Sequence, residues 1–115
     1  MFEFQKLEVY KKAKSFHKDA TELISTIKPN KTVKDQLSRA SFSIVLNIAE
    51  GSGRFSKPDR RNFFVIARGS VFECVAILDV LHDQQLINEP GFDSFLKKAD
   101  ELSRILYAMV KNLSA

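Results

Sequence analysis

The sequence predicts an all-α protein, an antiparallel up-down-up-down four-helix bundle formed as a single domain by residues 1–115. Apolar residues recur every three to four positions along four long segments, which is the period of one helix face. Short turns separate these segments, so consecutive helices must run antiparallel. The chain has only four Gly and three Pro, and 44% of its residues are hydrophobic, which is enough to bury a core.

The first helix is predicted from about Phe4 to Ile27, with apolar residues in helical register throughout and lysines between them. Lys28–Lys31 is predicted to be a turn, because Pro29 disfavours the helical conformation in the residue before it. The second helix should open at Thr32–Asp35, which resembles a capping box.

The stretch Arg39–Arg54 forms the body of the second helix and carries apolar residues on more than one side. A polar line runs beside them at the same helical spacing: Arg39, Ser43, Asn47, Glu50 and Arg54. We expect neighbours on more than one side of this helix, so that the polar line lies partly inside the structure. The alternative is a surface stripe on an ordinary bundle helix. Gly51 and Gly53 are expected to end the helix in the left-handed conformation.

The third helix is predicted from about Lys57 to Leu86, with Ser56 as its N-cap. Gly69 lies in the middle of this helix, where it costs about 1 kcal/mol relative to Ala, and close helix–helix approach is the expected reason. Ser70 and Glu73 are expected to meet Asn47 and Glu50 of the preceding helix. Two carboxylates there would need a cation, and Arg39 or Arg68 is available.

The last helix follows a turn predicted at Asn88–Gly91 and takes its apolar residues from Phe92 to Leu113. The chain contains no internal repeat and no low-complexity segment.

The formal charge of +4 and the sequence pI of about 9.3 permit an anionic partner. The charge is unevenly spread, because residues 54–68 contain five basic and one acidic residue while residues 69–101 contain two basic and seven acidic residues. The turn between the second and third helices is therefore basic, and free N–H groups at the start of the third helix also favour anions. The predicted nucleic-acid-binding residues are Lys11, Lys14, Lys18, Arg54, Lys57, Arg60 and Arg61. The alternative is a solvated charged face.

No catalytic constellation is found in the sequence. His17 and His82 are isolated, Cys74 lies on a core line, and no Glu-x-x-His pair occurs. The single cysteine excludes an intrachain disulfide and a cysteine-cluster metal site. We therefore expect no enzyme, cofactor or metal. No signal peptide or membrane span is apparent, so a cytoplasmic protein without a membrane partner is expected.

A family resemblance rests on residues spread along nearly the whole chain: Gln36-Leu37, Arg39-Ala40, Ser43-Ile44, Asn47–Gly51, Gly53-Arg54, Phe63-Phe64, Ile66-Ala67, Gly69-Ser70 and Glu73. These segments resemble the four-helix-bundle family of 23S rRNA-intervening sequence proteins, also labelled S23 ribosomal protein. The chain departs from the family at Val45-Leu46, where members often carry a proline.

The resemblance implies an up-down-up-down bundle that assembles as a ring-shaped homopentamer. The family also resembles the accessory protein of diversity-generating retroelements, a basic pentameric barrel that binds nucleic acid and a reverse transcriptase. The motif positions, with Arg68 beside them, form a predicted polar cluster with a structural or binding role: Arg39, Asn47, Glu50, Gly51, Arg54, Arg68, Gly69, Ser70 and Glu73.

Two functions remain open at this point. The first is a homo-oligomeric module that binds RNA or DNA through its basic surface, with contacts dominated by the phosphate backbone. The second is a scaffold ring whose partner is a protein. An enzyme acting on a phosphorylated substrate is a weaker third hypothesis, because no paired acid, base or nucleophile is present.

Overall fold

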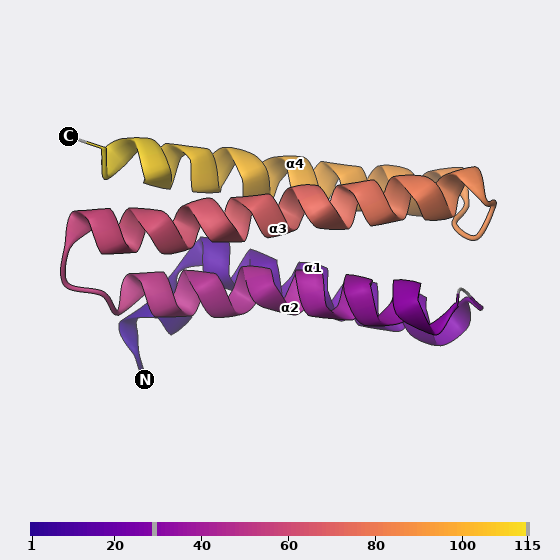
Figure 1. Ribbon diagram of the computed structural model, residues 1–115, viewed down its shortest axis with the longest axis horizontal. Helices are drawn as coiled ribbons and strands as arrows, with labels where there is room; N and C mark the ends of the chain where they lie inside the picture. Colours follow the sequence, from indigo (N-terminus) through magenta and orange to yellow (C-terminus); the bar gives the residue numbers. More distant parts are fainter. Residues whose placement is uncertain (29, 115) are drawn as a thin grey trace.

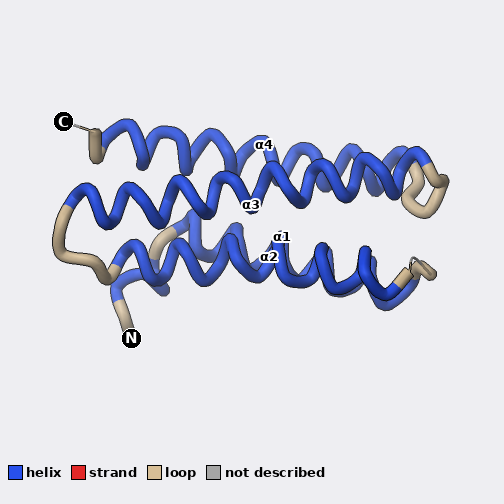
Figure 2. Tube along the Cα trace, in the orientation of Figure 1, coloured by secondary structure: helices blue, strands red, loops and turns tan. Residues whose placement is uncertain are grey.

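The computed structural model describes residues 1–28 and 30–114, which form four antiparallel α-helices (Figures 1 and 2). The helices are α1 (Glu8–Thr26), α2 (Lys31–Ser52), α3 (Lys57–Asp83) and α4 (Glu89–Asn112), and a short 3₁₀ turn, η1 (Glu3–Lys6), precedes them. The described residues contain no strand. The predicted all-α class with four helices is therefore confirmed.

The helices pack side by side in chain order, and α1 also packs against α4, so that the four surround one core. Each helix contributes a fully buried side chain to this core, Phe16, Ile44, Leu78 and Leu106 respectively. The rings of Phe16 and Phe95 meet edge to face at 5.9 Å, which joins α1 to α4. The N-terminus, the end of α4 and the α2–α3 turn all lie at one end of the bundle (Figure 1).

Side chains cap the starts of the last three helices. Ser56 Oγ accepts a hydrogen bond from the Asp59 amide at 3.2 Å, which confirms Ser56 as the N-cap of α3. The capping box expected at Thr32–Asp35 is wrong, because the N-cap of α2 lies two residues before Thr32, at Asn30, whose Oδ1 accepts from the Val33 amide at 2.8 Å. Pro29, on which the predicted turn depended, lies outside the described residues.

The first helix is not continuous from Phe4, because Leu7 has an extended backbone that separates η1 from α1. The predicted turn at Asn88–Gly91 is also shorter than expected. Asn88 is the N-cap of α4, and its Oδ1 accepts from the Gly91 amide at 2.8 Å, so Glu89, Pro90 and Gly91 already belong to the helix.

Helix α3 ends at Asp83, three residues before the predicted Leu86. Gln85 adopts the left-handed conformation with φ of 62°, and the Leu86 amide donates back to the Leu81 carbonyl at 3.0 Å. This is the hydrogen bonding of a Schellman motif, with Gln in the place that glycine usually takes. Glutamine is not a residue that typically adopts this conformation, so the apolar pattern alone predicted a helix that extends beyond its observed end.

Gly53 ends α2 as predicted, but neither Gly53 nor Gly51 takes the predicted left-handed conformation. Gly51 is a buried residue inside the helix, and Gly53 caps it in the right-handed helical region with φ of −90°. A Cβ at Gly51 would lie 2.8 Å from Phe64 Cε1 and 2.9 Å from Phe63 Cβ. Gly51 is therefore needed for the close approach of α2 and α3, and not for a left-handed turn.

Candidate functional site

The structure brings together three polar side chains between α2 and α3. Ser70 Oγ donates to Ser43 Oγ at 2.9 Å, and Asn47 Nδ2 lies 3.0 Å from Ser43 Oγ and 2.8 Å from the Ser43 carbonyl oxygen. Ser70 is buried, while Ser43 and Asn47 are half-buried. Each of the three side chains makes a hydrogen bond within this network, which therefore links α2 to α3.

The charged residues of the predicted polar cluster do not take part in this hydrogen-bond network. Arg39, Glu50 and Glu73 are exposed, and none of them forms an ion pair with another described residue. Because α2 and α3 run antiparallel and Ser43 meets Ser70, Glu50 and Glu73 lie on opposite sides of this contact along the bundle, so the expected carboxylate pair is not formed within one chain. Arg68 is turned towards α4, because its Nε donates to the Ser103 carbonyl of that helix at 3.1 Å.

A mostly apolar groove of about 450 Å³ runs between α3 and α4, lined by Val65, Arg68, Gly69, Phe72, Tyr107 and Val110. The guanidinium of Arg68 lies over the rings of Phe72 and Tyr107, at 4.8 and 5.4 Å from their centroids. Gly69 is exposed here, and nothing lies within 4 Å of the position its Cβ would take. The close approach predicted at Gly69 is therefore not made by any described residue of the same chain.

Four basic residues surround the α2–α3 turn: Arg54, Lys57, Arg60 and Arg61, hereafter the basic cluster. None of them forms an ion pair with another of the described residues. The Arg54 guanidinium lies 4.6 Å from the centre of the Phe63 ring, and Arg61 Nε donates to Ser114 Oγ at 2.9 Å. Arg60 Nε is shielded from solvent without a hydrogen-bond acceptor among the described residues.

The start of α3 offers fewer free amides than the sequence suggested. Pro58 has no N–H group, and the Asp59 amide already donates to Ser56. The Asp59 carboxylate also occupies the first turn, where it interacts favourably with the helix dipole. Attraction of an anion to this turn therefore depends on the basic side chains, and the expected contribution of the free helix N-terminus is largely absent.

The three lysines predicted on α1 lie on a different part of the surface. Lys11, Lys14 and Lys18 are exposed, at the spacing of one helix face. Lys11 pairs with Glu8 at 3.6 Å, and the Lys14 ammonium lies 5.1 Å from the centre of the Tyr10 ring. The first turns of α1 share an end of the bundle with the basic cluster (Figure 1). Lys18 lies about 15 Å further along the axis than Glu8, at a rise of about 1.5 Å per residue.

Sequence reasoning missed Phe55, whose side chain is fully exposed at 105% of its reference area. It stands in the α2–α3 turn, next to Arg54 and two residues before Lys57. The only signal of its exposure in the sequence was its position in the turn between the end of one predicted helix and the start of the next, because residues in turns lie at the surface.

The hydroxyl group of Ser41 and the thiol of Cys74 are both shielded from solvent. Ser41 Oγ and His17 Nδ1 share a hydrogen bond of 2.7 Å, but Ser41 is fully buried, so no substrate can reach its hydroxyl group. Burial lowers the pKa of His17 from its ordinary value, which favours the neutral imidazole. Cys74 is also fully buried, and desolvation, followed by the Glu73 carboxylate, raises its thiol pKa to about 12.

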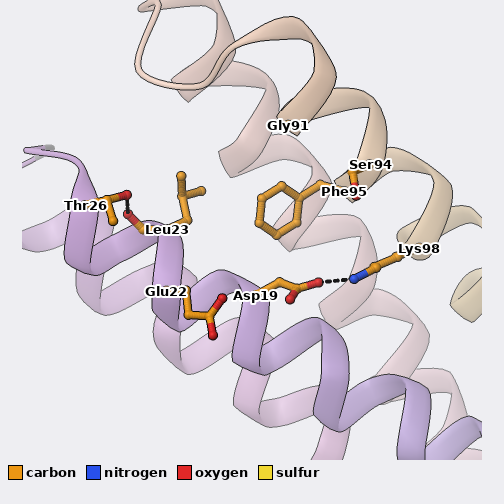
Figure 3. A pocket seen from close by; sticks show the side chains of 8 residues that line it. All are labelled: Asp19, Glu22, Leu23, Thr26, Gly91, Ser94, Phe95 and Lys98. Atoms are coloured by element: carbon orange, nitrogen blue, oxygen red, sulfur yellow. Dashed lines mark hydrogen bonds and ion pairs between the residues drawn. The ribbon is translucent and has the colours of Figure 1, made fainter.

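A shallow hollow between α1 and α4 contains a charged pair, Asp19 and Lys98 (Figure 3). Asp19 and Lys98 neutralise each other, whereas Glu22, which also lines the hollow, forms no ion pair with another described residue. The hollow therefore offers a ligand one carboxylate and no unpaired cation. Among residues 1–28 and 30–114, no group of three or more metal-ligating side chains comes together. No helix in these ranges is both long enough and apolar enough to cross a bilayer.

One solved structure with a similar fold is that of a protein with unknown function from the S23 ribosomal protein family of Bacteroides thetaiotaomicron. It is 22% identical in sequence, with a TM-score of 0.83, and the alignment covers 90% of this chain and 98% of that chain. At this identity the likeness shows a shared fold. No curated protein matches the chain. The sequence model of the 23S rRNA-intervening sequence proteins matches residues 5–108, and the chain therefore belongs to this family.

Proposed function

We propose that this chain is a non-enzymatic homo-oligomer that binds the phosphate backbone of RNA or DNA through the basic cluster. The observation that carries the proposal is the gathering of four cations at one turn without an ion-paired carboxylate among the described residues. Unpaired cations attract phosphate more strongly than cations already neutralised by the protein. The distribution of charge along the bundle reinforces this effect, because acidic residues gather near the opposite end: Asp79, Asp83, Glu89 and Asp93.

The contact between Arg54 and Phe63 suits Arg54 to phosphate recognition. A guanidinium lying over an aromatic face is held there by the ring quadrupole, while its N–H groups point outward in its own plane. Those N–H groups fit two oxygens of one phosphate. The ring therefore holds the cation in place without using the donors that a phosphate needs.

Self-association is supported by apolar surface that a single chain leaves exposed. The α3–α4 groove displays Phe72 and Tyr107, which are 55% and 54% exposed. On α2, Phe42 and Leu46 stand one helical turn apart and are 47% and 43% exposed. Exposed apolar patches of this kind mark interaction surfaces. A second copy that places Phe42 and Leu46 in the groove beside Gly69 would cover both patches.

Such a contact joins two different faces of the same chain, so it is heterologous, and it generates a ring when the rotation between copies closes. The family resemblance implies a ring of five. When the bundle axes run parallel in such a ring, all copies of the basic cluster lie on the same face. Their positive charges then act together on one polyanion.

Fluorescence anisotropy with a short labelled RNA duplex tests the nucleic-acid proposal, at salt between about 50 and 200 mM. A triple variant, Arg54→Gln, Lys57→Gln and Arg61→Gln, should weaken binding at low salt and reduce the salt slope by about 0.9 for each phosphate that is no longer neutralised. The matched control is Lys28→Gln, Lys31→Gln and Lys34→Gln, which removes the same charge around the α1–α2 turn at the other end of the bundle.

Equally weakened binding in the two triple variants would mean that net charge alone matters, and the basic cluster would have no special role. Absence of binding by the wild-type chain at low salt would remove the nucleic-acid proposal altogether. The scaffold hypothesis would then be favoured, with a protein as the partner.

Sedimentation velocity tests the self-association. The wild-type chain should sediment as an oligomer, and Phe72→Asp and Phe42→Asp should each dissociate it, because either change places a charge in an apolar contact. Val80→Asp is the control, since Val80 is 51% exposed near the far end of α3 and outside the groove. A wild-type chain that sediments as a folded monomer at micromolar concentration would contradict the proposal.

A further inference from the structure

Phe55 is the most exposed large hydrophobic side chain of the described residues, and it stands at the α2–α3 turn inside the basic cluster. Exposed apolar side chains that occur singly are common on protein surfaces. Phe55 differs from such residues in its position. It directly follows Arg54, whose guanidinium is held on another ring, and it precedes Lys57 by two residues.

A ligand that matches this arrangement must carry negative charge and flat apolar faces in close alternation. An apolar peptide would match the ring but not the unpaired cations around it. A nucleic-acid duplex would match the cations, but its base faces are stacked on one another and cannot cover the ring. A single strand presents both phosphates and free base faces, and proteins bind such strands by combining a basic surface with stacking aromatics.

We propose that Phe55 is a base-stacking residue and that the preferred ligand of the basic cluster is single-stranded nucleic acid. This inference rests on the function proposed above, since the stacking ring needs the neighbouring cations to bring the backbone close. Arg54 and Lys57 would bind phosphates on either side of the nucleotide whose base covers Phe55. Because every base has a flat face, this contact gives little sequence preference.

The test measures binding of three labelled probes of equal length: an oligouridylate, an RNA duplex and an abasic strand that keeps only the phosphate backbone. Phe55→Ala should weaken oligouridylate binding by about tenfold or more, which is the effect of removing one base–aromatic contact. Binding of the duplex and of the abasic strand should stay unchanged. Val80→Ala, which also removes exposed apolar surface on α3, should leave all three affinities unchanged.

A second variant provides a direct readout of stacking. The chain contains no Trp, so Phe55→Trp introduces a single indole at the turn. This variant should retain the affinity for oligouridylate, and its fluorescence should be quenched by that probe but not by the abasic strand. Weaker oligouridylate binding by Phe55→Ala together with base-dependent quenching in Phe55→Trp would establish the stacking contact.

Three outcomes would overturn the inference. If Phe55→Ala binds oligouridylate like the wild type while the duplex and abasic strand still bind, the stacking role is wrong but the proposed function survives. If the wild-type chain binds none of the three probes at low salt, both proposals fail. If Phe55→Ala no longer binds phosphatidylserine vesicles and keeps its affinity for oligouridylate, the ring is a membrane contact.

Discussion

Gly51 on α2 lies so close to Phe64 on α3 that a Cβ at position 51 would be 2.8 Å from the Phe64 ring. Phe64 is only 2% exposed and cannot swing away into solvent, and the Cβ of Phe63 blocks the other side at 2.9 Å. The two helices therefore approach each other at a point where one of them has no side chain. This contact lies directly beneath the turn that carries the basic cluster.

Gly51→Ala should destabilise the fold. Overpacking of this kind costs about 1–3 kcal/mol, and the better helix propensity of Ala returns about 1 kcal/mol, so a net destabilisation on the order of 1 kcal/mol is expected. Urea unfolding followed by circular dichroism measures it. Gly53→Ala is the matched control, because its Cβ would find no atom closer than 3.6 Å, and it should be neutral or slightly stabilising. An unfolding midpoint for Gly51→Ala equal to that of the wild type would contradict this explanation.

The hydrogen bond between Ser43 and Ser70 should appear as coupling in a double-mutant cycle. Ser43→Ala leaves the buried Ser70 hydroxyl without its α2 partner, whereas Ser70→Ala leaves Ser43 still bonded to Asn47. We expect Ser43→Ala to be the more damaging single change and the coupling free energy to be about 1 kcal/mol. Strictly additive effects on the free energy of unfolding would show that the two hydroxyls do not stabilise each other.

Cys74 should be inert in the folded protein. Its thiol is fully buried and its pKa is raised to about 12, so almost no thiolate exists at neutral pH. Labelling with a disulfide reagent at pH near 8 should be slow in buffer and should accelerate in urea in parallel with unfolding. Fast labelling under native conditions would mean that α3 opens locally around this residue.

Stability should fall on mild acidification because of His17. Burial lowers its pKa in the folded state from the ordinary value of 6.5, so the unfolded state binds the proton more readily. The His17 contribution is fully present above the unfolded pKa and is lost as pH falls from there through the folded pKa. His17→Gln should therefore show a weaker decline of thermal stability between neutral and mildly acidic pH than the wild type. An unchanged pH profile would show that protonation of His17 is not the cause of the decline.

Local patterns were enough to predict much of the fold. The apolar period indicated four helices, and Ser56 was identified as a cap because its hydroxyl acts within its own first turn. The helix ends were less well predicted where long-range packing or an unusual conformation decided them. Gln85 takes the left-handed conformation without being glycine, and Leu7 interrupts a continuous apolar period with an extended backbone.

The candidate site was only partly predictable for a related reason. The helical spacing of Asn47 within α2 and of Ser70 within α3 indicated that each residue faces the other helix. The structure joins the two residues through Ser43. The pattern did not reveal that Glu50 and Glu73 remain exposed and separate, because the periodicity of a single helix carries no information on the angle and offset between two helices. Phe55 was missed because exposure of a turn residue depends on what the rest of the chain leaves uncovered.

The sequence by itself determined that this chain forms four antiparallel helices with a basic turn between the second and third, since periodicity, turn residues and charge are local properties. Only the tertiary structure decided that Gly51 serves the contact with Phe64, that Gly69 faces an open groove, and that Arg54 is held on Phe63 beside a bare Phe55. These are relationships between side chains on different elements. They arise when packing fixes the distance and rotation of one helix against the next, which no single stretch of sequence specifies.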